Sequence, residues 1–350
     1  DATVGARHER VDELMAHIAD AALDGARGNS GAIMAQYFQG FSESVSGQRL
    51  LTPESMARAS TAGAASAWKA MAMPVPGTLP TVIEDFSAEL SAQVVAGVHD
   101  FRTLLRRGLE RAHSSLANTP NQLPALRQAG VVDAGGQGFV DFLEGICMFM
   151  EKGTVDETPP EVQEIGVSMP VALDKGAHRY CTECVIAAAD LDRDLILQSL
   201  ARLDSSSLVV AGGRERLRVH VHVNNPAEVF LACAGFGDIT QQKADDMQRQ
   251  RGLMNQAGNV AIVTDSGADI PPAESERLGI HVVPVRLSFG DHEYLDGVSL
   301  TPTEFYTLLA QSRDAPLTSQ PPAQDFSRVY SLLTSHGHDV ISVGLSSALS

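Results

Sequence analysis

Residues 1–153 carry the periodicity of amphipathic helices. From His8 to Leu23, apolar side chains recur at the i, i+3, i+4, i+7 spacing of one helical face. Helices joined by short turns favour an antiparallel arrangement, so the sequence predicts an all-helical antiparallel bundle or barrel. The further helices of this region are predicted over residues 30–45, 53–73, 78–98, 100–117 and 138–150.

The pattern changes after residue 152. Residues 152–166 are acidic and contain two adjacent prolines, which is typical of a linker. Beyond them, stretches of period-two alternation lie between helical stretches, which predicts a small α/β domain over residues 166–250. Its elements are predicted as strands over 179–187 and 217–223, helices over 193–203 and 226–234, and a short helix with a connector over 234–259.

A third domain is predicted over residues 259–350. Strands are predicted from Val260, over 279–289 and over 339–345, with helices between them. Thr301 and Glu304 are three residues apart at the start of one helix, which predicts a capping box. Strands that alternate with helices favour a parallel sheet. The sequence stops at Ser350 directly after a strand, so we expect an incomplete α/β domain.

Composition narrows the classes of function. The chain has 350 residues and a net charge of −17, which predicts poor nucleic-acid binding unless a local basic patch exists. Four arginines between Arg102 and Arg111 share one amphipathic helix and are expected to form a solvated face. No apolar run reaches the roughly 18 residues of a membrane span. The four cysteines lack the pattern of a small disulfide-rich secreted domain, which favours a reducing cytoplasm.

The stretch LDGARGNSGAIMAQ, residues 23–36, is the first candidate site. Gly25, Gly28 and Gly31 are spaced three apart ahead of an apolar helical run, and Asn29 or Ser30 is the predicted helix cap. Glycines let backbone N–H groups approach a ligand, and a helix N-terminus attracts anions. The stretch therefore predicts a phosphate contact. The alternative is a glycine-rich turn packed tightly between two helices.

Two more glycine motifs follow, Pro76-Gly77-Thr78 and VDAGGQG over 132–138. Over residues 5–152 the three motifs together resemble the L-subunit-type domain of dihydroxyacetone kinases, and within that family the kinase component of bacterial fatty acid kinase. The resemblance implies ATP and magnesium as cofactors. It also implies nucleotide-binding roles for Gly28, Asn29, Ser30, Gly31, Gly77, Thr78, Asp133 and Gly135.

The sequence departs from that family in one respect. Such kinases carry a DGDTG-like motif, whose aspartates hold magnesium, upstream of the stretch that corresponds to GARGNSG. Here the sequence begins about 24 residues before Gly25, without this motif and without a P-loop. Because phosphoryl transfer depends on positioning by metal ions, negligible kinase activity is expected of this chain by itself. We expect a fragment of a longer active protein; the alternative is a protein that lost the motif and acts in binding or regulation.

A metal site is predicted in the middle domain. His220 and His222 alternate with valines, so on a strand they share one face with Cβ atoms roughly 6–7 Å apart. Cys181 on the other strand is the candidate third ligand. Cys184 completes a C-x-x-C pattern, but residues three apart on a strand face opposite ways, so Cys184 is expected in the core.

The predicted donor set is thus Cys181, His220 and His222, with Glu183 or water as the fourth ligand. One thiolate and two imidazoles suit zinc. The alternative is two surface histidines and one buried cysteine. RYCTE and VHVHVNNP are similar to the middle domain of the fatty acid kinase component, which implies zinc at these residues, in a structural or regulatory role.

Four motifs in the last 90 residues resemble the start of the DegV family of fatty-acid-binding proteins. They are VTDSGADIP, YLDGVSLTPTEFY, LTSQPPAQDF and VGLSSALS. The resemblance implies that Thr318 and Ser347 hold a fatty acid carboxylate, as hydroxyls in loops beyond strand ends. Family members continue well past the position of Ser350, so the chain as given is expected to bind fatty acids weakly.

Together these features predict a three-domain cytoplasmic protein of bacterial type. The complete protein is expected to phosphorylate a fatty acid carboxylate with ATP, with kinase and lipid-binding parts in one chain. Its partners would be ATP and a fatty acid, and a homodimer is the assembly that the sequence leaves open. Two alternatives stand beside this: a dihydroxyacetone-type kinase, and a non-catalytic lipid carrier or sensor.

Overall fold

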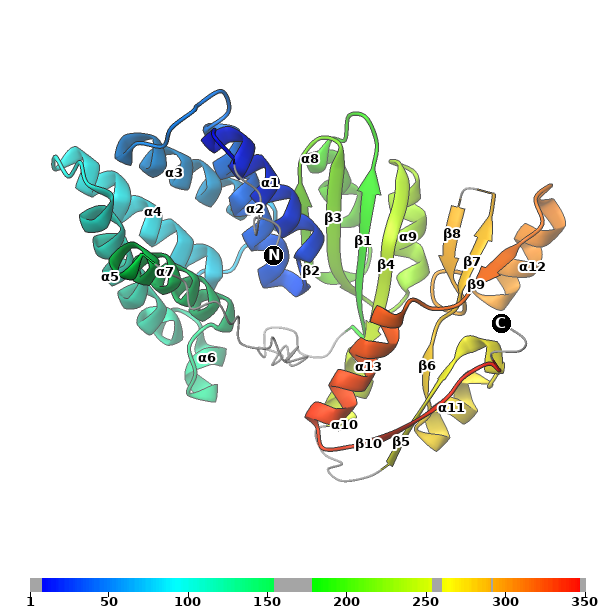
Figure 1. Cartoon of the computed structure of the whole chain (residues 1–350). Helices are drawn as coiled ribbons and strands as arrows, with labels where there is room; N and C mark the ends of the chain where they lie inside the picture. Colours follow the sequence, from blue (N-terminus) through cyan, green and yellow to red (C-terminus); the bar gives the residue numbers. More distant parts are fainter. Residues whose placement is uncertain (1–7, 154–177, 254–259, 291, 347–350) are drawn as a thin grey trace.

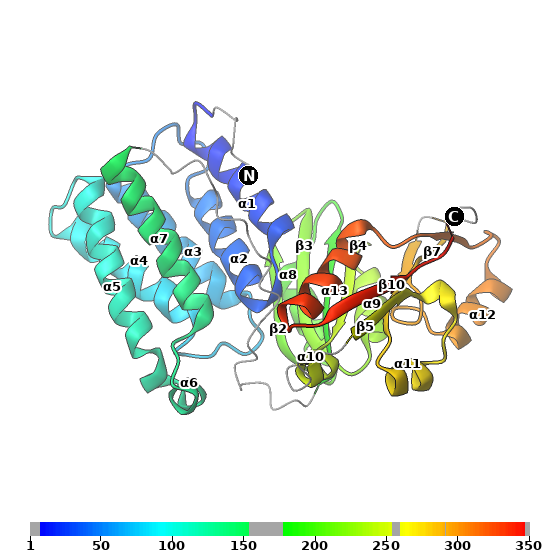
Figure 2. The same cartoon turned by 60° about the horizontal axis from the view of Figure 1, so that its bottom comes forward.

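The computed structural model describes residues 8–153, 178–253, 260–290 and 292–346. A helical region, a four-stranded sheet and a region of shorter strands follow one another in chain order (Figure 1). A second view shows the sheet lying between the other two regions (Figure 2). The predicted combination of an all-helical part with α/β parts is confirmed. The linker predicted over 152–166 lies, beyond Gly153, outside the described residues.

Seven helices form the first region, and their shared core contains the buried side chains of Phe86, Leu90 and Phe139. Helices α2 and α3 approach closely at Gly63, where a Cβ atom would lie 2.6 Å from the carbonyl oxygen of Tyr37. The helices are α1 (Val11–Gly25), α2 (Gly28–Ser44), α3 (Pro53–Lys69), α4 (Leu79–Val95), α5 (Phe101–Gln122), α6 (Pro124–Ala129) and α7 (Ala134–Lys152). The sequence did not predict α6.

Two helices begin earlier than predicted. Helix α2 begins at Gly28, and Asn29 and Ser30 lie in its first turn, so the prediction that one of them caps the helix is wrong. The N–H of Gly28 donates instead to Glu183 of the middle region at 3.0 Å. Helix α7 begins at Ala134 instead of residue 138, because Asp133 caps it by accepting from the N–H of Gly136 at 2.7 Å.

The middle region is an antiparallel sheet of order β2-β3-β1-β4. The short helix predicted within 234–259 is present over 247–253, but the rest of that prediction is wrong, because residues 238–246 form a strand. That strand is almost entirely polar and irregular in register, so it lacks the alternation that identifies strands. The elements are β1 (Tyr180–Ala187), α8 (Arg193–Leu200), β2 (Ser205–Gly212), β3 (Arg216–Val223), α9 (Pro226–Ala234), β4 (Asp238–Asp246) and α10 (Met247–Leu253).

Both edges of this sheet contact another region. The segment after α3 pairs with β2: the N–H of Val210 donates to the carbonyl of Ala70 at 2.9 Å, and that of Ala72 donates to Leu208 at 3.1 Å. At the opposite edge, the side chain of Gln242 on β4 donates to the carbonyl of Glu293 at 2.5 Å. The sheet therefore joins the helical region to the third region.

The third region contains two small sheets. Strands β10, β5 and β6 form the predicted parallel sheet, and the capping box of Thr301 and Glu304 is confirmed. The single strand predicted over 279–289 is wrong: Pro284 interrupts it, and its two halves join different sheets. The elements are β5 (Val260–Asp265), η1 (Ser266–Ala268), α11 (Pro272–Leu278), β6 (His281–Val283), β7 (Arg286–Phe289), β8 (His292–Leu295), α12 (Pro302–Gln311), β9 (Leu317–Ser319), α13 (Ala323–Ser335) and β10 (Asp339–Val343).

A buried histidine makes the stability of the third region depend on pH. His281 is 8% exposed, and burial together with Arg249 and His338 lowers its pKa to about 4. Between pH 6.5 and 4 the unfolded chain binds more protons at this residue than the folded chain, so stability falls as pH falls. We expect acidification from pH 7 to 4 to cost about 2 kcal/mol through His281.

Urea titrations at the two pH values measure this cost. The variant His281→Leu should lose that part of the pH dependence, whereas His292→Leu, at an exposed histidine, should follow the original chain. An unchanged pH dependence in His281→Leu would contradict the assignment.

Candidate functional site

Three helix N-termini open on one cleft of about 2240 Å³ between the regions. They are the starts of α2, α4 and α7. Of the eight residues predicted to bind nucleotide, Gly31 and Gly77 do not line the cleft. A Cβ atom on Gly31 would lie 3.2 Å from Ala26, and one on Gly77 would lie 2.7 Å from Gln122, so both pack closely against protein. The six that line the cleft are Gly28, Asn29, Ser30, Thr78, Asp133 and Gly135.

The three glycine motifs meet where α2, α4 and α7 begin. A Cβ atom on Gly135 would lie 2.5 Å from Ser30 Oγ and 3.2 Å from Leu79 Cβ. Only glycine permits this approach, so Gly135 brings the starts of the three helices together.

Asp133 and Thr78 shape these helix starts. The Asp133 side chain is 7% exposed. Burial raises the pKa of its carboxyl group, although hydrogen bonds from the N–H groups of Gly136, Leu79 and Gly135 act in the opposite direction. The Thr78 hydroxyl donates to the carbonyl of Val75 at 2.7 Å. Both side chains thus have hydrogen-bond partners within the protein. Asp133 was predicted from the sequence as a nucleotide-binding residue, and its capping of α7 was not predicted.

Asn29 offers an acceptor to the cleft. Its Oδ1 atom is buried and has no hydrogen-bond partner. A buried acceptor without a donor costs about 1–3 kcal/mol, so such an atom is a candidate ligand contact. It lies in the first turn of α2, which has no side-chain cap and lines the cleft.

Strand pairing brings the predicted metal ligands together. In the register of β1 and β3, Cys181 lies opposite His222 and Glu183 lies opposite His220. The donor atoms of Cys181, His220 and His222 all lie within 4.8 Å of one another. Among the residues that the structure describes, this is the one group of three His, Cys, Asp or Glu side chains so arranged. Cys184 lies on the other face, fully buried in the core, as predicted.

The chemistry of this cluster fits zinc. His220 Nδ1 lies 2.9 Å from Glu183 Oε1, while His220 Nε2 is buried without a hydrogen-bond partner. A ligand histidine typically gives one ring nitrogen to a carboxylate and the other to the metal. Burial raises the pKa of Cys181, but the charge and hydrogen bond of His220 outweigh it and lower that pKa to about 7, which favours the thiolate.

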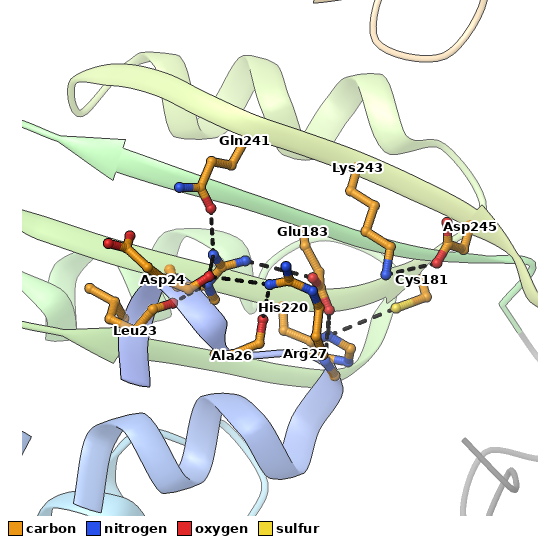
Figure 3. Close-up of polar contacts among 12 residues, drawn as sticks. Leu23, Asp24, Ala26, Arg27, Cys181, Glu183, His220, Gln241, Lys243 and Asp245 are labelled. Carbon is orange, nitrogen blue, oxygen red and sulfur yellow. Dashed lines mark hydrogen bonds and ion pairs between the residues drawn. The ribbon is translucent and has the colours of Figure 1, made fainter. Parts of the chain in front are cut away.

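Glu183 is the central charge of the site. It is 2% exposed, and Lys243 lies opposite it on β4. Burial raises the pKa of Glu183, but His220, Lys243 and the N–H of Gly28 bring it well below its ordinary value. Figure 3 shows Glu183 and Lys243 on neighbouring strands, with Cys181 beside His220. The sequence suggested Glu183 as a metal ligand and gave no sign of its contact with Gly28.

The predicted carboxylate-binding residues, Thr318 and Ser347, belong to the third region. Thr318 is exposed in the middle of β9, opposite Leu287 of β7, so its predicted place in a loop beyond a strand end is wrong. It does not line the cleft. Ser347 lies outside the described residues.

Within the described part of the chain, no helix has the length and apolar character required to cross a bilayer. The cysteines Cys147, Cys181, Cys184 and Cys233 are all free.

Three family models match the chain in order. The DAK2 domain matches residues 2–148, the middle domain of FakA-like fatty acid kinase proteins matches residues 177–253, and the uncharacterised DegV family matches residues 259–350. The combination of families inferred from the motifs is thereby confirmed.

Curated relatives are uncharacterized proteins of staphylococci. One from Staphylococcus saprophyticus is 29% identical over 304 residues, which is 84% of this chain and 54% of that protein. One from Staphylococcus epidermidis is 30% identical over 287 residues, which is 75% of this chain and 52% of that protein. The chain spans about half the length of these relatives.

Solved structures of two DegV proteins resemble the chain over part of its length. For the fatty acid binding protein DegV of Bacillus subtilis, the identity is 35%, the TM-score is 0.26, and the match covers 27% of this chain and 33% of that chain. For a DegV family protein of Thermus thermophilus, in a structure titled for its fatty acid binding, the identity is 37%, the TM-score is 0.24, and the shares are 26% and 32%.

Proposed function

Because this chain combines a DAK2 domain, a FakA-like middle domain and a DegV-family region, we propose that it serves the ATP-dependent phosphorylation of a fatty acid carboxylate. In this reaction a carboxylate oxygen attacks the γ-phosphorus of ATP, the bond to the β-phosphate oxygen breaks, and acyl phosphate and ADP leave. The observation that carries the proposal is the convergence of three helix starts and a metal-type cluster on one cleft.

The helix starts supply the nucleotide site in this proposal. Unpaired N–H groups in the first turn of α2 bind phosphate oxygens, helped by the positive end of the helix dipole. Asn29 and Ser30 face the same space, and the buried Oδ1 of Asn29 accepts a hydrogen bond from the nucleotide or contacts its cation. Thr78, Asp133 and Gly135 hold the starts of α4 and α7 in place around it.

Magnesium would need oxygen ligands near the helix starts. The carboxylate of Asp133 is engaged by backbone N–H groups, and the described residues offer no further carboxylate cluster at the helix starts. These residues do not form a magnesium site by themselves.

Zinc is the metal proposed for Cys181, His220 and His222. When bound, it would supply a fixed positive centre that holds three side chains of two strands in one geometry. Glu183 keeps the His220 ring oriented by accepting from Nδ1. The role proposed is structural or regulatory, because these residues belong to the sheet and not to the helix starts.

The fatty acid carboxylate is assigned to the DegV-family region. Thr318 and Ser347 are proposed to donate their hydroxyl protons to it, on the basis of the family motifs that contain them. Joining this region to the DAK2 domain in one chain raises the effective concentration of the acyl substrate at the nucleotide site.

The test is the trapping of acyl phosphate with hydroxylamine. The protein at its natural length is incubated with ATP, Mg²⁺ and oleate, and hydroxamate is measured. We expect hydroxamate to form, and Thr318→Ala to raise the KM for oleate about 10-fold, the size expected from losing one hydrogen bond to a charged group. Thr303→Ala, at an exposed threonine of α12, is the matched control and should leave KM unchanged.

Two outcomes would contradict the proposal. Phosphorylation of dihydroxyacetone without any hydroxamate would favour the triose kinase. Fatty acid binding without ATP binding would favour a lipid carrier or sensor.

A further inference from the structure

Two buried charges of the middle sheet hold the turn between α1 and α2 from both ends. Arg218 of β3 is 3% exposed and donates from Nε to the carbonyl of Leu23 at 2.8 Å and from Nη2 to that of Asp24 at 3.3 Å. Glu183 of β1 accepts from the N–H of Gly28 at 3.0 Å. The guanidinium thus meets the last carbonyls of α1, and the carboxylate meets the first N–H of α2.

This arrangement matches the polarity of the two helices. A cation is stabilised at a helix C-terminus and an anion at an N-terminus. The two charges also face each other, with Arg218 Nη1 at 3.7 Å from Glu183 Oε2. Arg218 has a further acceptor in Gln241 Oε1 at 2.6 Å. A buried ion pair needs such additional hydrogen bonds to offset the cost of its desolvation. Because several of these bonds go to the turn, the turn and the ion pair fix the geometry of each other.

The same carboxylate oxygen reaches the metal cluster. Glu183 Oε1 accepts from Gly28 N–H at 3.0 Å and lies 2.9 Å from His220 Nδ1. One atom therefore joins the ring of a metal-ligating histidine to the first residue of α2. Figure 3 shows Glu183 and His220 close to the turn between α1 and α2, which carries Ala26 and Arg27.

We propose that Glu183 and Arg218 are positioning residues that fix the turn over residues 25–28, and that a divalent metal at Cys181, His220 and His222 controls the rigidity of this turn through Glu183. The inference rests on the metal site and the nucleotide turn of the proposed function. A metal that fixes the His220 ring also fixes the acceptor of the Gly28 N–H. Since coupling between two sites is reciprocal, ATP and zinc strengthen the binding of each other.

Amide hydrogen exchange over residues 25–31 tests the coupling without any activity assay. In the full chain, removal of zinc by a chelator is expected to speed exchange of the Gly28 amide about 10-fold, which lies within the usual range of coupling. The variant Glu183→Gln keeps the shape of the side chain but removes its charge. It should show the faster exchange while zinc remains bound in a 1:1 ratio.

The control is Arg214→Gln. Arg214 also belongs to the middle region but pairs with Asp190 in an exposed ion pair, away from the turn. It should show the exchange rates and the zinc content of the original chain. A second measurement, the Kd of a non-hydrolysable ATP analogue, should rise about 5-fold or more on zinc removal and in Glu183→Gln.

Three other outcomes would distinguish a failure of this inference from a failure of the proposed kinase function. Equal exchange in Glu183→Gln and the original chain, both loaded with zinc, would overturn the positioning role. Absence of zinc binding in the original chain would overturn the metal control together with the proposed metal site. Faster exchange on zinc removal in a protein that binds no ATP would support the control of the turn by the metal, while the coupling to ATP and the proposed kinase function both fail.

Discussion

Cys181→Ser is expected to abolish stoichiometric zinc binding, with a loss of affinity of at least about 100-fold. The thiolate is the strongest donor of the Cys181, His220 and His222 cluster, and a hydroxyl group does not replace it at neutral pH. Metal content after dialysis, and competition with a chromophoric chelator, measure the loss.

Cys184→Ala is the matched control for this experiment. Cys184 belongs to the same C-x-x-C pattern but is fully buried in the core on the opposite face of β1. The alanine variant should keep zinc even if it is less stable. Retention of zinc in Cys181→Ser would reject the cluster, and loss of zinc in both variants would favour the C-x-x-C pair as the binding site.

Gly63→Ala is expected to lower the free energy of unfolding of the helical region by about 2–3 kcal/mol. The added Cβ would lie 2.6 Å from the carbonyl oxygen and 2.7 Å from the ring of Tyr37, so α2 and α3 would have to move apart. Trp68, the single tryptophan, lies on α3 five residues further on and reports the transition by fluorescence in a urea titration.

Gly145→Ala provides the opposite case. Gly145 is exposed in the interior of α7, and no atom lies within 4 Å of the position of its Cβ. Alanine is the better helix former, so this variant should gain roughly 0.4–1 kcal/mol. If both variants gained stability, the close approach of α2 and α3 would be relaxed in solution and the packing argument would fail.

Periodicity predicted the elements that bury one apolar face. The helices of the first region other than α6, and strands β1, β3 and β5, have such faces. Strand β4 does not, because its residues are polar and join the sheet through backbone pairing with β1. Pro284 divided a continuous apolar stretch between two sheets, since an imino acid cannot donate to the ladder. The local sequence pattern does not indicate which strand a given strand pairs with.

The candidate site likewise contains some contacts that local spacing predicts and others that it does not. Alternation on β3 placed His220 and His222 on one face, and strand parity separated Cys181 from Cys184, so the cluster could be predicted from spacing. The contacts of Glu183 with Gly28 join residues 155 apart in the sequence, and no local rule predicts them. The cap at α2 was wrongly assigned for this reason: a residue of another region satisfies the N–H.

The pairing of residues 70–72 with β2 has a consequence for synthesis and for dissection of the chain. An unpaired strand edge is a template for association between molecules. The segment that covers the edge of β2 lies about 140 residues earlier in the sequence, so it leaves the ribosome before the strand it protects. A middle region produced alone would lack this cover and expose β2 at one edge and β4 at the other, and it should self-associate at concentrations at which the intact chain stays dispersed.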